Sequence, residues 1–172
     1  VQLHGPTADD ASLHIEGFTI QNGRKQGATS GGDGLTFAFG GGFLADRASV
    51  TARNLVIKNN QAIGGNTSSA YGGAGSGGGM AFRANTNGVY LENIVFEGSQ
   101  ARGGKGKERG GLGIGGGLYT YNAVVTGSTL TFTNNTAQAG SSNGNGSSGN
   151  NYADAQGGGA AFEGRDPAFQ HR

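Results

Sequence analysis

The chain has 172 residues, with 38 glycines, 2 prolines, no cysteine and a formal net charge of +1. The high glycine content lacks the strict third-residue period of collagen, and the absence of cysteine excludes disulfides and thiolate metal sites. The near-neutral charge and the lack of a basic stripe with interleaved aromatics argue against a nucleic-acid partner. No apolar run approaches the roughly 18 residues that cross a bilayer, so we expect no membrane insertion.

Two motifs recur along the chain at a step of about 37 residues. Triple glycines followed by an apolar residue begin at Gly40, Gly77, Gly115 and Gly157, which are 37, 38 and 42 residues apart. An apolar-x-x-polar motif keeps the same step, and its copies are Ile57–Asn60, Phe96–Ser99 and Phe132–Asn135, with a degenerate earlier copy at Ile20–Gly23. A fixed period of this length indicates stacked structural repeats.

Short alternating stretches between these motifs predict strands, because their apolar members have period 2 and glycine interrupts any helix. One repeat is interpreted as three strands, typified by 42–45, 49–52 and 55–58. When the repeats are overlaid in chain order, the apolar residues fall into four columns, which are Leu13/Val50/Val89/Val125, Ile15/Ala52/Leu91/Gly127, Phe18/Leu55/Ile94/Leu130 and Ile20/Ile57/Phe96/Phe132. We expect the last two columns to be buried and stacked in register.

The remaining segments, 24–39, 63–76, 102–114 and 138–156, are rich in Gly, Ser and Asn and vary in length. They all leave the repeat between the polar turn and the next triple glycine, so we expect them to form insertions on one edge. The predicted fold is all-β: a right-handed parallel β-helix of about four coils of three short strands, with residues 1–172 forming a single segment. Such stacking buries a thin core between coils about 4.8 Å apart.

Glycine and asparagine have expected structural roles in this fold. Gly77–Gly79 recurs in register with three other copies and is followed by no helix, so we expect a turn or close-packing role and not a phosphate cradle. Asn accepts left-handed backbone angles, and stacked amides can bond from coil to coil. Asn60 and Asn135 would form such a ladder, interrupted by Ser99.

These residues resemble the GGA[ILV] and FxxN repeats of chlamydial polymorphic membrane protein passengers and related bacterial surface β-helices of the pectin-lyase-like superfamily. Phe132–Asn135 matches FxxN outright, Ile57–Asn60 keeps its shape, and Phe96–Ser99 replaces the Asn. Triple glycine stands where the family has Gly-Gly-Ala. The resemblance covers nearly the whole chain and implies an extracellular or cell-surface location and an adhesive or structural role. It transfers no catalytic residue.

The sequence assembles no catalytic or metal-binding constellation. The acids Asp9, Asp10, Asp33, Asp46, Asp154 and Asp166 fall in different columns, and no two from consecutive coils share a face at the separation that paired-carboxylate chemistry needs. The three histidines, His4, His14 and His171, lie near the two ends. The charge cluster 105–109 lies in a glycine-rich insertion, where we expect a solvated loop. Asp33 and Asp154 are candidate Ca²⁺ ligands, but single carboxylates make weak sites. We therefore expect no cofactor.

Outward strand positions carry the candidate contacts. Asp46 with Arg83, and Lys58 with Glu97, occupy neighbouring coils of one column each and are expected to pair across strands. Three tyrosines are candidate ligand-binding residues, since exposed rings can stack on the sugars of cell-surface glycans: Tyr90, Tyr119 and Tyr121.

The leading hypothesis is a noncatalytic extracellular structural or adhesive module, and the alternative is a fragment of a carbohydrate-active β-helix enzyme, either a polysaccharide lyase or a glycoside hydrolase. Neither end carries an amphipathic helix that would cap the coils. Because uncapped solenoid ends recruit other strands, we expect end-to-end self-association or further coils of a longer parent chain.

Overall fold

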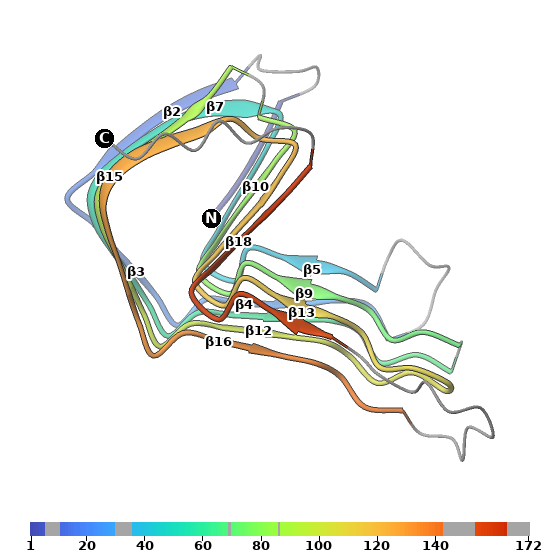
Figure 1. Ribbon diagram of the computed structural model, residues 1–172. Coiled ribbons are helices and arrows are strands. Elements are labelled where there is room, and N and C mark those ends of the chain that lie inside the picture. The colour runs from blue at the N-terminus through green and yellow to red at the C-terminus, as the bar shows by residue number, and fades with distance from the viewer. Residues whose placement is uncertain (6–10, 30–35, 69, 86, 143–153, 165–172) are drawn as a thin grey trace.

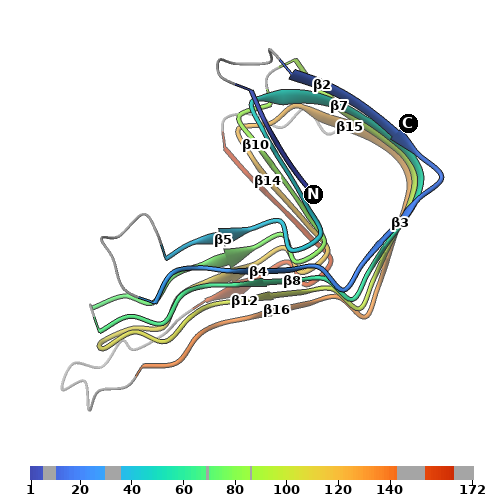
Figure 2. The same cartoon turned by 180° about the vertical axis from the view of Figure 1, so that it is seen from behind.

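A computed structural model describes residues 1–5, 11–29, 36–68, 70–85, 87–142 and 154–164 of the chain. These residues form an all-β solenoid of parallel strands with about three turns and no helix (Figures 1 and 2). The prediction of a parallel β-solenoid is confirmed. The turn count is slightly below the expected four coils, because the described first and last coils are incomplete.

Four parallel sheets run along the solenoid, and each coil contributes to all of them apart from the last, whose described residues contribute to sheet A alone. Sheet A contains β1 (Gln2–His4), β6 (Phe43–Asp46), β10 (Met80–Arg83), β14 (Leu118–Tyr121) and β18 (Ala160–Glu163). Sheet B contains β2 (Ala11–Glu16), β3 (Thr19–Gln21), β7 (Ala48–Lys58), β11 (Val89–Glu97) and β15 (Val125–Thr133). Sheet C contains β4 (Arg24–Gln26), β8 (Gln61–Ile63), β12 (Gln100–Arg102) and β16 (Thr136–Gln138). Sheet D contains β5 (Ala38–Phe39), β9 (Gly75–Ser76), β13 (Gly113–Ile114) and β17 (Ala155–Gln156).

The strand plan differs from the predicted three short strands per coil. The expected second and third strands are one bent strand, β7 or β11, and the bend lies at Asn54 or Asn93, whose φ angles are 52° and 53°. Two further strands, in sheets C and D, lie within or next to the segments interpreted as insertions. The prediction that these segments leave the coil on one edge is confirmed, because their described residues together form an arm that projects from the core in both views (Figures 1 and 2).

The predicted columns pair in register. Val50 lies beside Val89, Leu55 beside Ile94 and Ile57 beside Phe96, and all six side chains are buried. Burial fails in the outer coils, where Phe18 is 62% exposed and Phe132 is 36% exposed. The expectation that both columns are buried throughout is therefore wrong at their ends, since a side chain in an outer described coil has a neighbouring coil on one side alone.

The two sequence motifs meet at the neck between core and arm. A Cβ added to Gly41 would lie 2.4 Å from the carbonyl carbon of Gln61, and one added to Gly42 would lie 2.8 Å from Cγ of Asn60. Gly40 precedes them with a φ of 64°. The triple glycine thus makes the turn into sheet A and lets its backbone pass against the Asn turn, which confirms the turn and close-packing role.

The inward-facing residue of the Asn turn ties each coil to the one before it. The Asn60 side chain accepts a bond from the Gly23 N–H and donates to the Ile20 carbonyl, both at 2.8 Å. Asn135 does the same with the Ser99 N–H at 3.0 Å and the Phe96 carbonyl at 2.8 Å. The bonds run from amide to backbone and not from amide to amide. The residues with left-handed angles are the preceding ones, which are Asn22, Asn59, Gly98 and Asn134.

Beyond sheets C and D the arm is held together by glycine backbone. The N–H groups of Gly73, Gly104, Gly111 and Gly140 donate to the carbonyls of Gly65, Gly73, Gly104 and Gly111 respectively, at 2.8–3.0 Å. The bonds therefore alternate between the outgoing and returning legs of successive coils. A Cβ on Gly111 would lie 1.8 Å from the Gly73 carbonyl oxygen. The two layers can approach this closely because neither carries a side chain at the contact.

Candidate functional site

The arm leaves a groove between sheet D and the outer face of sheet A, and its volume is about 560 Å³. In Figure 1 the two walls are seen as β18 with β10 on one side and β5 with β9 on the other, meeting at the triple-glycine turn. The lining residues come from successive coils, so the groove runs along the solenoid axis. They are Phe37, Phe39, Ala74, Ser76, Arg83, Leu112, Ile114, Tyr119, Tyr121 and Glu163.

The sheet A wall has two rows of outward side chains. The inner row is apolar and packs against the base of sheet D; it contains Leu44, Ala81, Tyr119 and Ala161. The outer row alternates in charge and hydrogen-bonding character across the coils; it contains His4, Asp46, Arg83, Tyr121 and Glu163. Asp46 approaches both the His4 ring at 3.7 Å and the Arg83 guanidinium at 4.0 Å. The predicted pairing of Asp46 with Arg83 is confirmed.

The sheet D wall supplies a run of aromatic rings. The centroids of Phe37 and Phe39 lie 6.2 Å apart, and Phe39 stacks on Tyr119 at 6.1 Å with an interplanar angle of 25°. The guanidinium of Arg83 lies 4.3 Å from the Phe39 centroid, which is cation–π geometry. Phe37 is 42% exposed and Tyr121 is 43% exposed, so an open ring stands on each wall.

Tyr119 and Tyr121 face the same groove, as expected for residues two apart on a strand. Their exposure differs from the expectation of open rings on a flat sheet, because the arm covers Tyr119 to 5% exposure. The Tyr119 hydroxyl donates to Glu163 at 2.9 Å. Burial, reinforced by the hydrogen bond and the negative charge of Glu163, raises the pKa of the Tyr119 phenol well above its usual value, so Tyr119 is a neutral donor at the base of the groove.

The two carboxylates of the outer row of sheet A are too far apart to act as a pair. Asp46 and Glu163 are separated by three strand steps, because Arg83 and Tyr121 lie between them in register. At about 4.8 Å per step this is about 14 Å, whereas glycosidase carboxylates stand roughly 5–9.5 Å apart.

Of the two predicted calcium positions, the structure describes Asp154 and does not describe Asp33. Asp154 is exposed and lies further out on the arm, in a second hollow of about 510 Å³ with Phe37, Tyr71 and Arg109. Among the described residues, no three His, Asp or Glu side chains gather at metal-binding distance.

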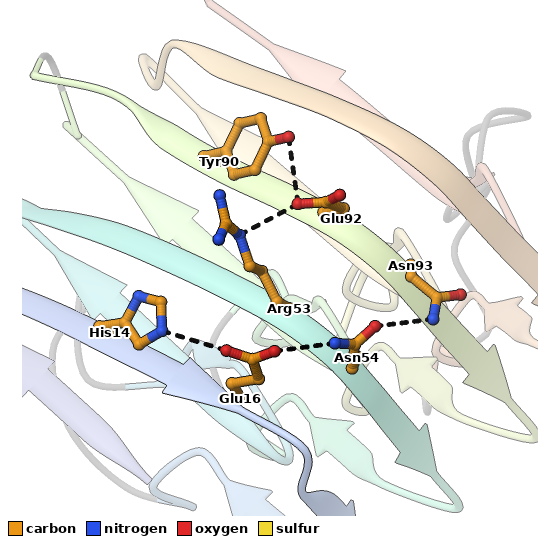
Figure 3. Close-up of polar contacts among 7 residues, drawn as sticks. All are labelled: His14, Glu16, Arg53, Asn54, Tyr90, Glu92 and Asn93. Carbon is orange, nitrogen blue, oxygen red and sulfur yellow. Dashed lines mark hydrogen bonds and ion pairs between the residues drawn. The ribbon is translucent and has the colours of Figure 1, made fainter.

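Tyr90 lies on a different face, the outer surface of sheet B (Figure 3). Its hydroxyl donates to Glu92 at 3.2 Å, and the guanidinium of Arg53 lies 5.5 Å from its ring while pairing with Glu92 at 3.0 Å. The structure therefore brings together Tyr119 and Tyr121 and separates Tyr90 from both.

A second chain of contacts in Figure 3 crosses three coils. His14 lies 3.5 Å from Glu16, Glu16 accepts from Asn54 at 2.9 Å, and Asn54 accepts from Asn93 at 2.8 Å. The amide-to-amide bond predicted for Asn60 and Asn135 is found here instead, between Asn93 and Asn54. Such exposed ladders join neighbouring coils and contribute a few tenths of a kcal/mol per pair.

Sequence reasoning missed Phe37 and Phe39, because they lie in a segment interpreted as an insertion. The signal was present: apolar residues at alternate positions recur as Leu112 and Ile114 in register two coils later. Period-2 spacing of this kind is typical of a strand.

Comparison of the chain with known protein families, with curated proteins and with solved structures gives no match. In the part of the chain that the structure describes, no helix has the length and apolar character to cross a bilayer.

Proposed function

We propose that the chain is a noncatalytic structural or adhesive β-solenoid module of the cell surface or extracellular space, which holds a glycan chain in the groove between sheets A and D. The observation that carries this proposal is the aromatic groove itself. Phe37 and Tyr121 present open rings on opposite walls, and Arg83 and Glu163 supply polar groups beside them. Sugar rings bind to such sites through an aromatic face and a few placed hydrogen bonds.

The resemblance to passengers with GGA[ILV]/FxxN repeats supports the surface location, and the groove geometry supports binding without catalysis. The Asp46 carboxylate is engaged by His4 and Arg83, and Glu163 accepts the Tyr119 hydroxyl. Both acids are therefore occupied by neighbours, and their separation is too large for paired acid–base work.

The test is binding of soluble polysaccharides by calorimetry, with a glycan array to choose the polymers. Tyr121→Ala and Phe37→Ala each remove one open ring, so we expect each to weaken binding about five- to tenfold, since stacking on one ring is worth on the order of 1–1.5 kcal/mol. Tyr90→Ala is the matched control on sheet B and should leave the affinity unchanged. Loss of binding in Tyr90→Ala alone would indicate a binding site on sheet B and would contradict the proposal that the groove binds the glycan.

Product analysis distinguishes a noncatalytic binding module from the alternative, a carbohydrate-active enzyme. The proposal expects no new reducing ends and no unsaturated sugar products after prolonged incubation with the bound polymer. Product formation that Asp46→Asn or Arg83→Gln abolishes would establish the enzyme instead. Either substitution alters the outer row of sheet A and leaves the buried columns intact.

We also propose that strands cover the apolar side chains of the outer described coils, supplied either by further coils of a longer chain or by another copy. Phe18 and Phe132 are the exposed rings that such strands would bury. Light scattering and electron microscopy of the isolated chain test self-association. A monomer at all concentrations would contradict stacking between copies.

A further inference from the structure

The outer face of sheet C differs in charge from the rest of the solenoid. Half of its outward strand side chains are glutamines, and Arg24, Arg102 and Lys105 are exposed near them. In the described part of the chain none of these three cations has an acidic partner. We call this surface the cationic face. A shallow hollow of about 290 Å³ joins its residues, including Gln26, Asn66 and Gln138.

On sheets A and B, three cations are paired with acids of the neighbouring coil. Arg53 lies 3.0 Å from Glu92, Lys58 lies 3.2 Å from Glu97, and Arg83 lies 4.0 Å from Asp46. These ion pairs between neighbouring coils neutralise the cations on the outer faces of sheets A and B. The cationic face lacks such a ladder, so its positive charge is available to an external anion.

The register of sheet C sets the spacing of the charges. Arg24 begins β4 and Arg102 ends β12, and β8 lies between these two strands. The two strands are therefore about 9.6 Å apart across the sheet, and Arg102 lies two residues, about 6.6 Å, further along its strand than Arg24, so their Cα atoms are about 12 Å apart. Lys105 follows β12. Its backbone N–H donates to the Asn66 side chain at 2.8 Å, and this bond holds the Lys105 backbone in place beside the hollow.

We propose that the cationic face binds a linear anionic polysaccharide, with the carboxylate or sulfate groups of the polymer on Arg24, Arg102 and Lys105 and its hydroxyls on the neighbouring amides. Guanidinium groups bind such anions through paired N–H donors, and glutamine and asparagine amides both donate to and accept from hydroxyls. This surface lies on the opposite side of the arm from the aromatic groove and does not depend on it.

The lining of the face favours a polysaccharide over other polyanions. Among the described residues that line the hollow none is aromatic, so unpaired nucleic-acid bases find no ring to stack on. Ile63 is the one large apolar side chain in that lining, which is too little to insert into a bilayer.

The test uses polygalacturonate and chondroitin sulfate as probes, dextran as the neutral polymer, and calorimetry at two salt concentrations. We expect both acidic polymers to bind, with affinity that falls as salt rises. Arg102→Gln should weaken binding several-fold, and the triple variant Arg24→Gln/Arg102→Gln/Lys105→Gln should abolish it. Circular dichroism verifies that each variant is folded.

The matched control is Arg53→Gln/Lys58→Gln, which removes the same type of charge from sheet B and should leave the affinity unchanged. Equal loss in this control would show a dependence on net charge and overturn the proposal. Double-stranded DNA or vesicles of anionic phospholipid that bind as tightly as the polysaccharides, or full binding by the triple variant, would also overturn it. Tyr121→Ala tests the groove separately, and it should leave binding of the acidic polymers intact.

Discussion

Gly111→Ala tests whether the arm is held by backbone packing. The added Cβ would lie 1.8 Å from the Gly73 carbonyl oxygen, where an ordinary contact needs at least 3.4 Å, so the two legs of the arm would have to separate by about 1.6 Å. Gly111 donates to Gly104 and accepts from Gly140 at 2.8 and 2.9 Å. A shift of that size breaks both of these hydrogen bonds, the one to Gly104 and the one from Gly140.

The magnitude follows from two costs. Overpacking costs about 1–3 kcal/mol, and loss of two hydrogen bonds adds about 0.5–1.5 kcal/mol each. We therefore expect Gly111→Ala to destabilise the arm by about 2–6 kcal/mol. Urea unfolding measures the global effect, and hydrogen exchange by mass spectrometry over residues 100–114 measures the local one, because the arm can open while the core stays folded.

Gly159→Ala is the matched control. Its added Cβ would lie 3.4 Å from Phe132, an ordinary contact, and Gly159 has no positive φ. This change should be neutral or should stabilise the chain by up to about 1 kcal/mol through the unfolded state. If the free energy of unfolding and the exchange of residues 100–114 were the same in both variants, backbone packing of the arm would be refuted.

Three further predictions concern the core and the groove. Ile94→Ala should lower the free energy of unfolding by about 2–5 kcal/mol in denaturant melts, because it leaves a cavity between stacked coils. Asn60→Ala should cost about 1–3 kcal/mol through two lost bonds, and Asn60→Ser should cost less, because Ser99 occupies the same position one coil on. Tyr119 has a raised pKa when folded, so its contribution to stability is present below about pH 10 and falls as pH rises further. The free energy of unfolding of Tyr119→Phe, measured as a function of pH, should lack the part of the decrease above about pH 10 that comes from Tyr119.

The repeat columns could be predicted because the same apolar spacing occurs in every coil. Leu55, Ile94 and their neighbours are core residues in each copy, so one alignment set the register of sheet B. Burial of the outer copies could not be predicted in the same way. The exposure of Phe18 depends on what lies beyond its coil, and the spacing of its own repeat is identical to that of the buried copies.

The arm could not be predicted from hydrophobic periodicity, because its contacts are made by backbone atoms. Its signal was instead the recurrence of glycine pairs: 64–65 is followed by 103–104, and 72–73 by 110–111, at steps of 39 and 38 residues. These steps match the repeat of the core. A flexible linker would not keep paired glycines in register, so the periodic pairs were evidence of ordered layers.

The candidate site follows from the arm and not from the core. Tyr119 and Tyr121 stand on a strand whose outer face would be a flat surface if the coil closed directly at the triple glycine. The arm carries sheet D out beside that face, so Phe37 and Phe39 come opposite the tyrosines and the surface becomes a groove. The other side of the same arm presents sheet C and its cations. Glycine at the contact of the two legs keeps these layers thin and aligned from coil to coil, so each coil adds one increment to both surfaces. The length of the groove and of the cationic face is therefore set by the number of stacked repeats.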